Sequence, residues 1–177
     1  MVRPLRLFLA LSLLALAASC RMQEDGAKAE DTANTPTKPS SPAPLPSPSA
    51  KVRIQHPPTE GDVAPIVRGE LEKAQHDGRR LVVYEGATWC QPCQQFHKAI
   101  ERGDLDSAFP ELTLLEFDAD RDGERLLNAG YSSKYIPLLA LPRADGSSSG
   151  QQVEGGVKGD GAVGVISTKL RGLLASK

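Results

Sequence analysis

The chain has 177 residues, with 21 Lys and Arg against 22 Asp and Glu, so its formal net charge is −1 at pH 7. This balance, with no basic patch along the chain, argues against a nucleic-acid partner. The front third lacks the composition of a folded domain, whereas residues 59–177, 119 in number, suffice for one compact core.

Residues 1–19 have the layout of an export signal. Arg3 and Arg6 form a positively charged start, and the apolar run over residues 7–18 is too short for a membrane span. The run ends in Leu16-Ala17-Ala18-Ser19-Cys20, and small residues before a cysteine resemble the bacterial lipobox, although the leucine stands one position further from the cysteine than is usual. The resemblance implies cleavage before Cys20 and attachment of lipid to it. The alternative is an ordinary secretory signal cut nearby, with Cys20 incidental.

Residues 20–58 are predicted to be a Pro-rich disordered tether. Six prolines fall between Pro36 and Pro48, a composition that cannot bury enough apolar surface to fold. Lipid on Cys20 would hold the chain on a membrane, and it would explain the odd number of cysteines, three, in an exported protein. Arg21 stands where proteobacterial lipoproteins retained at the inner membrane typically have Asp, so we expect the outer membrane where the organism has one.

The folded part is predicted to begin with a helix over residues 62–77, which Asp62 can cap and Gly78 can end. A strand over Leu81–Glu85 follows, and a second helix is predicted from Gln91 to Arg102. The apolar residues at helical spacing are Val63, Ile66, Val67, Leu71 and Ala74 in the first helix and Phe96, Ala99 and Ile100 in the second.

Two cysteines separated by two residues stand where this strand passes into the second helix, in Thr88-Trp89-Cys90-Gln91-Pro92-Cys93. Unpaired N–H groups and a partial positive charge at a helix N-terminus favour a thiolate over a thiol. Cys90 is therefore the candidate attacking thiolate, and Cys93 is the thiol that resolves the mixed disulfide. Pro92 lacks an N–H, which costs little in the first turn of a helix.

An irregular or one-turn segment over residues 105–109 precedes a central strand over residues 112–117. The acidic run over residues 118–123 begins like a calcium-binding loop, but the closing glutamate is missing, so a solvated turn is favoured. A helix over residues 124–129 follows. A hairpin of residues 136–141 and 151–154, turning at Ala144-Asp145-Gly146, then leads to a final helix that Asp160 can cap. The order α-β-α-β-α-β-β-α predicts an α/β fold, a mixed sheet flanked by helices on both faces.

Trp89-Cys90-Gln91-Pro92-Cys93, together with the later Ile136-Pro137 that opens a strand, resembles the thioredoxin superfamily over residues 59–177. The resemblance implies a thioredoxin-like fold, a redox-active Cys90–Cys93 disulfide and a cis peptide bond before Pro137. It implies a substrate groove lined by Ile136, Pro137 and the residues beside the cysteines, namely Trp89, Gln91 and Pro92. No cofactor beyond the cysteine pair is implied.

The cysteines have two alternative uses. His97 lies four residues after Cys93 and could join the pair as a third metal ligand, but a structural zinc site needs four ligands and no second cysteine pair exists. A purely structural disulfide is disfavoured, because closing so short a loop removes little conformational entropy from the unfolded chain.

The group that takes the proton of Cys93 is not defined by the sequence. Thioredoxins proper carry a buried Asp six residues before the first cysteine, and this chain has Tyr84 there with Glu85 next to it. Strand alternation puts Glu85 on the opposite face from Tyr84. Glu85 is kept as a possible proton-transfer residue; the alternatives are water and the absence of any well-tuned proton acceptor.

These features predict a monomeric, membrane-anchored thiol–disulfide oxidoreductase of the cell envelope. Pro92 and Ile136 resemble the reducing members of the superfamily, so we expect it to reduce protein disulfides and to receive electrons from an envelope dithiol partner. The alternatives are a non-catalytic binding module for an envelope protein and a dedicated reductant of cytochrome c maturation.

Overall fold

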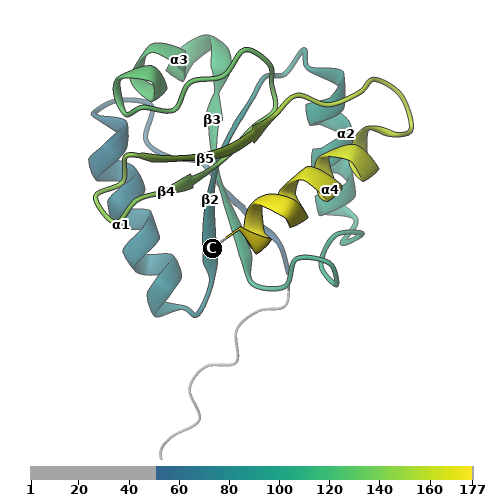
Figure 1. Ribbon diagram of the computed structural model, residues 1–177, viewed down its shortest axis with the longest axis horizontal. Coiled ribbons are helices and arrows are strands. Elements are labelled where there is room, and N and C mark those ends of the chain that lie inside the picture. Colours follow the sequence, from purple (N-terminus) through teal and green to yellow (C-terminus); the bar gives the residue numbers. More distant parts are fainter. Residues whose placement is uncertain (1–50, 177) are drawn as a thin grey trace, which may run out of the picture. The chain divides into compact units, whose positions relative to one another are not determined.

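The computed structural model describes residues 51–176. The predicted signal segment, Cys20 and most of the predicted tether lie outside the described residues. The described part contains five strands and four helices in the order β-α-β-α-β-α-β-β-α (Figure 1). They are β1 (Arg53–Gln55), α1 (Val63–His76), β2 (Arg80–Gly86), α2 (Gln91–Glu101), β3 (Leu112–Asp118), α3 (Ala119–Asn128), β4 (Leu138–Pro142), β5 (Ser148–Glu154) and α4 (Ala162–Ala175).

The five strands form one mixed sheet in the order β1-β3-β2-β4-β5. Strands β1, β3 and β2 are parallel, whereas β4 runs antiparallel to β2 and pairs with β5 in a hairpin. The register places Tyr84 beside Glu116 and Glu85 beside Phe117 on neighbouring strands. Because successive side chains alternate between faces, Tyr84 and Glu116 share one face of the sheet, and Glu85 lies on the other.

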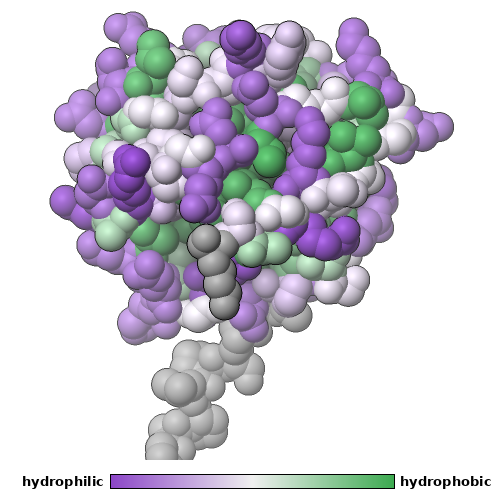
Figure 2. All heavy atoms as spheres, viewed as in Figure 1, coloured by the Kyte–Doolittle hydropathy of each residue, from purple (hydrophilic) through white to green (hydrophobic). Residues whose placement is uncertain are grey.

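Helices cover both faces of the sheet (Figure 1). One apolar core lies under α2 and α4 and contains Tyr84, Phe96, both cysteines of the motif and Leu170. The other lies under α1 and α3 and includes buried side chains of both helices and of the facing strands. The element order and the mixed sheet confirm the predicted thioredoxin-like α/β fold. On the outside, Figure 2 shows apolar residues in small separated groups among hydrophilic ones.

The folded region starts earlier than predicted. Arg53–Gln55 pairs in parallel with Thr113–Leu115 at the edge of the sheet, although these three residues fall within the range assigned to the tether. Arg79 helps to hold this segment, since its guanidinium donates to the backbone oxygen of Lys51 at 2.7 Å. The strand is too short to produce a readable alternation of apolar and polar residues.

Two predicted helix starts are corrected. Helix α3 begins at Ala119 and not at 124, because the side chain of Asp118 caps it by accepting hydrogen bonds from the N–H groups of Asp120 and Arg121. The acidic run therefore forms the N-cap and the first turn of α3. Helix α4 begins after Gly161, so Asp160 is not its N-cap.

The predicted hairpin turn is present, and Gly146 is required in it. Its φ is +85°, and a Cβ atom there would lie 1.9 Å from the backbone oxygen of Ala64 in α1. Its own carbonyl accepts a hydrogen bond of 2.8 Å from the buried hydroxyl of Tyr131. The β4–β5 turn is therefore packed directly against the first helix.

Candidate active site

Cys90 and Cys93 lie where β2 passes into α2 and are joined by a disulfide, with Cα atoms 5.2 Å apart. Cys90 is the N-cap of α2, and its sulfur accepts a hydrogen bond of 3.3 Å from the N–H of Cys93. Pro92 occupies the first turn, as expected. This geometry puts the sulfur of Cys90 among the free N–H groups and the partial positive charge of a helix N-terminus, where a thiolate is stabilised.

A groove of about 840 Å3 runs beside Cys90. It brings together four of the five predicted substrate-binding residues, namely Trp89, Gln91, Pro92 and Ile136. The fifth, Pro137, is buried next to Ile136, the peptide bond between them is cis as the resemblance implied, and the Pro137 carbonyl accepts a hydrogen bond from the N–H of Gly155. The groove therefore joins the cysteine motif to the start of β4 and to the loop after β5.

Hydrogen bonds from distant segments fix the motif residues around Cys90. The indole N–H of Trp89 donates to the carboxylate of Asp120 in α3 at 2.8 Å, although the Trp89 side chain is 65% exposed. The side-chain oxygen of Gln91 accepts from the N–H of Gly159 at 3.0 Å. The first bond fixes the orientation of the Trp89 side chain, and the second joins the loop after β5 to the first residue of α2.

The groove has exposed aromatic rings and a positive charge. Trp89 is joined there by Tyr135, which is 67% exposed. Three lysines, Lys134, Lys158 and Lys169, line the groove with one carboxylate, that of Glu154. The Glu154 carboxylate accepts hydrogen bonds from the backbone N–H groups of Lys134 and Tyr135. With three lysines against this one carboxylate, the groove lining has a net positive charge.

Tyr84 fills the position that holds a buried Asp in thioredoxins proper. Its ring packs against Phe96 and His97 at centroid distances of 6.1 and 5.5 Å. Burial, followed by the nearby Glu116 carboxylate, raises the pKa of the Tyr84 phenol far above its usual range. Gly86 makes room for the phenol, because a Cβ atom there would lie 2.8 Å from the ring. Tyr84 is therefore a neutral hydroxyl that cannot act as a base.

Glu85, the possible proton-transfer residue, lies away from the cysteines. The carboxylate accepts a hydrogen bond of 3.1 Å from Ser133, and its side chain is on the face of the sheet that α1 and α3 cover. Burial raises the pKa of Glu85, the Ser133 bond lowers it, and Asp122 raises it, with a net rise. The structure thus places a buried carboxyl group on β2, on the opposite face of the sheet from Cys93.

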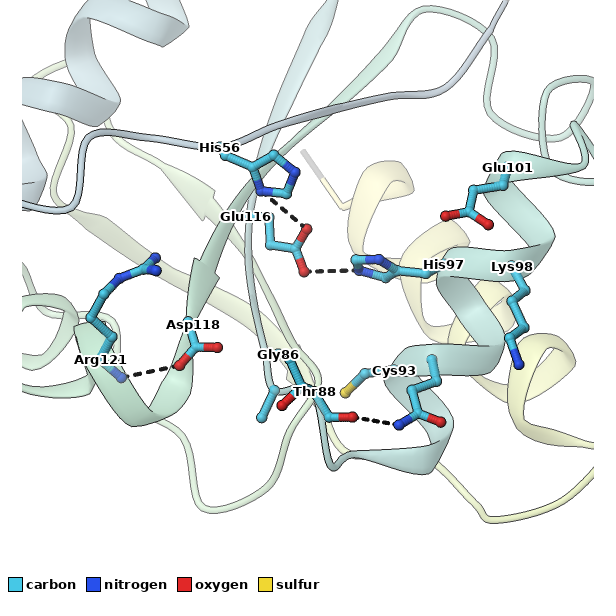
Figure 3. A pocket seen from close by; sticks show the side chains of 12 residues that line it. His56, Gly86, Thr88, Cys93, His97, Lys98, Glu101, Glu116, Asp118 and Arg121 are labelled. Carbon is cyan, nitrogen blue, oxygen red and sulfur yellow. Dashed lines mark hydrogen bonds and ion pairs between the residues drawn. The ribbon is translucent and has the colours of Figure 1, made fainter.

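A second cavity, of about 450 Å3, lies behind the disulfide and was not predicted (Figure 3). Cys93 lines it together with His97 of α2 and Glu116 of β3, whose side chains point toward each other. The Nε2 atom of His97 lies 2.9 Å from the nearer Glu116 oxygen, and His56 Nδ1 lies 3.5 Å from the other. The only sequence signal for this cluster was His97 at four residues from Cys93, on the same face of α2.

The acidic run is used structurally. The fully buried Asp122 forms ion pairs with Arg125 at 2.6 Å and Arg121 at 2.7 Å, and it accepts from the N–H of Asp118. Burial acts to raise the pKa of Asp122, but the hydrogen bonds from Arg121 and Asp118 outweigh it, and the pKa is lowered.

Within residues 51–176, no cluster of three or more His, Cys, Asp or Glu side chains is arranged to bind a metal ion.

Fold and site together define a thioredoxin-like domain with a dithiol–disulfide pair at the start of α2. A scan of the chain against protein-family models and a search of curated proteins gave no match. Among the described residues, no helix has the length and apolar character that crossing a membrane requires.

Solved thioredoxins are similar to the chain in structure. The oxidised form of thioredoxin O1 from Arabidopsis thaliana is 23% identical with a TM-score of 0.42, covering 70% of this chain and 95% of that one. A poplar thioredoxin h is 22% identical with a TM-score of 0.43, covering 72% and 99%. A mutant thioredoxin from Halobacterium salinarum is 20% identical with a TM-score of 0.42, covering 72% and 90%.

Proposed function

We propose that this protein is a thiol–disulfide oxidoreductase that reduces disulfides of envelope proteins through Cys90 and Cys93. One observation carries the proposal: a disulfide whose cysteines are separated by two residues stands at a helix N-terminus, and Cys90 lines a groove of about 840 Å3. So short a staple adds little stability. Its placement instead favours a reactive thiolate at Cys90 and a shielded resolving thiol at Cys93.

In the proposed reaction the Cys90 thiolate attacks one sulfur of a substrate disulfide, and the other substrate sulfur leaves as a thiolate. Cys93 then loses its proton and attacks Cys90, which breaks the bond between Cys90 and the substrate. Two electrons pass from the dithiol to the substrate. A dithiol protein of the envelope restores the reduced pair by the reverse sequence of exchanges.

The cellular setting belongs to the proposal. The signal segment and Cys20 support a lipid anchor, and the Pro-rich tether would let the domain reach partners away from the membrane. Pro92 and Ile136 resemble reducing superfamily members, which supports reduction as the direction. The positive groove with its exposed Trp89 and Tyr135 supports protein substrates with acidic residues beside the disulfide.

The test is turnover of insulin by the purified protein with dithiothreitol, monitored by precipitation of the freed B chain. We expect the wild type to accelerate reduction and Cys90→Ser to abolish the acceleration. Equal, negligible rates for both proteins would favour the alternative, a binding module without turnover. A preference for haem-site cysteines of apocytochrome c over insulin would favour the dedicated maturation role.

A further inference from the structure

The resolving cysteine is shielded from water. Cys93 is 3% exposed, and its surface faces the cavity behind the disulfide rather than the substrate groove. An ordinary cysteine thiol has a pKa of about 8.5, so at neutral pH an acceptor must remove its proton before it can attack. The acceptor has to be reachable from that cavity.

His97 and Glu116 are coupled to each other inside this cavity. His97 follows Cys93 by four residues on α2, which places both side chains on one face of the helix. Glu116 lies on β3 beside Tyr84 in the register, on the sheet face that α2 covers. The 2.9 Å contact between His97 Nε2 and a Glu116 oxygen joins the imidazole and the carboxylate in one pair.

The second oxygen of Glu116 is buried and has no hydrogen-bond partner within residues 51–176. The Nδ1 atom of the exposed His56 lies 3.5 Å from this oxygen. A cavity of about 450 Å3 has room for water molecules that could connect this oxygen or the imidazole with the sulfur of Cys93. The other charged groups that line the cavity are Lys98 and Glu101 on α2, Asp118 on β3 and Arg121 on α3.

We propose that the His97–Glu116 pair is the proton acceptor of Cys93 in the resolving step. In the mixed disulfide, the thiol of Cys93 gives its proton to the pair, and the resulting thiolate attacks the sulfur of Cys90. The Cys90–Cys93 bond forms, the Cys90–substrate bond breaks, and the substrate sulfur leaves into the groove as a thiolate, where solvent protonates it. The pair passes its own proton to water in the cavity. In the reverse direction, the pair returns the proton to Cys93 when the disulfide opens.

The two other candidate groups do not fit this role. Glu85 is on the opposite face of the sheet and bonded to Ser133. Tyr84 keeps its proton, because burial beside Glu116 raises its pKa far above its usual range. The inference rests on the proposed oxidoreductase function, so the experiment must separate failure of the function from failure of the acceptor.

Stopped-flow absorbance with excess dithiobis(nitrobenzoate) makes this separation. The reduced protein releases one coloured thiolate when the Cys90 thiolate attacks the reagent and a second when Cys93 resolves the adduct. We expect Glu116→Gln and His97→Gln to leave the first release unchanged and to slow the second about 10- to 100-fold between pH 5.5 and 7. The gap should close above about pH 9, where the thiol ionises without help.

Glu101→Gln is the matched control, because it removes a carboxylate from the same cavity without touching His97; it should retain wild-type kinetics. Glu85→Gln should do the same. The proposal is overturned by wild-type kinetics for both cavity variants at pH 5.5, by an equal loss in Glu101→Gln, or by a gap that persists at pH 9. Failure of the wild type to release either thiolate would instead remove the oxidoreductase function.

Discussion

Two glutamates on adjacent strands show how strand alternation assigns different roles to the same side chain. Glu85 of β2 and Glu116 of β3 differ by one step in register, so they face opposite layers of the domain. Glu116 opens into the cavity of Cys93 and is contacted by two imidazoles. Glu85 is packed in the other layer with a single side-chain hydrogen bond, from Ser133.

The burial of Glu85 predicts a measurable effect on stability. Burial, with a smaller contribution from Asp122, raises its pKa when the protein folds. Between the usual pKa of a glutamate and the raised pKa of Glu85, the folded state binds more protons than the unfolded state. The free energy of unfolding therefore falls as the pH rises through this range. We expect Glu85→Gln to raise the melting temperature at pH 7 and to have little effect at pH 4 or below.

Thermal unfolding of both proteins between pH 3.5 and 8 would check this. Glu72→Gln is a suitable control, since Glu72 is exposed on α1. A melting temperature that falls in Glu85→Gln at pH 7 would contradict the prediction and would mean that the charged carboxylate is needed in the fold.

At the level of elements, the first turn of α3 connects the acidic run to the active site. Asp118 caps the helix, whereas Asp120 uses its carboxylate to hold Trp89 beside Cys90. This contact joins segments 31 residues apart. It explains how an exposed indole can keep one orientation at the rim of the groove.

Asp120→Ala is expected to release the indole. Since Trp89 is the only tryptophan of the chain, its fluorescence should shift to the red and its anisotropy should fall. Loss of a carboxylate from the first helical turn should also cost about 0.3–1 kcal/mol of stability. Asp120→Asn retains an acceptor oxygen and should preserve most of the indole signal, and an unchanged spectrum in Asp120→Ala would contradict the proposed anchoring.

Local patterns predicted most of the fold. Helices α1, α2 and α4 are recognisable by their apolar spacing, and β2 and β3 by their apolar runs. The three-residue β1 was missed because it has no period to read, and it exists only because β3 offers it a partner. The start of α3 was misplaced because Asp-rich segments also occur in turns, and only the bonds to the Asp118 side chain distinguish a cap from a loop.

The same limit applies to the site. Cys90, Cys93 and four of the groove residues follow from two motifs, because the chemistry requires particular residues at fixed spacing. The pairing of His97 with Glu116 depends on how α2 packs over β3, across 19 positions of sequence, and on the register of β3 with β2. Neither residue belongs to a motif, so no sequence pattern could place them together.

For the whole molecule, the sign of the charge differs between the domain and its groove. Residues 59–177 have 14 Lys and Arg against 18 Asp and Glu, a balance of −4. The groove lining has the opposite sign of charge, with three lysines and one carboxylate, which accepts a hydrogen bond from a backbone N–H group. Lys169 is held in place by the carbonyl oxygens of Glu154 and Gly155 at 2.7 and 3.0 Å, while Lys134 and Lys158 are exposed.

The positive charge of the groove predicts a preference for acidic substrates. With two disulfide peptides that differ only in Asp or Lys beside the cystine, kcat/KM should favour the acidic peptide, and the preference should weaken as salt screens the charges. Lys134→Glu combined with Lys158→Glu should reverse the preference, by about 10-fold at low ionic strength, because each exposed charge contributes up to about 1 kcal/mol.

The control is the double variant Lys51→Glu with Lys73→Glu, which makes the same change in net charge just before β1 and on α1, outside the groove lining. It should leave the ratio of kcat/KM for the two peptides intact. Equal shifts in both double variants would show that net charge, and not the groove, selects the substrate.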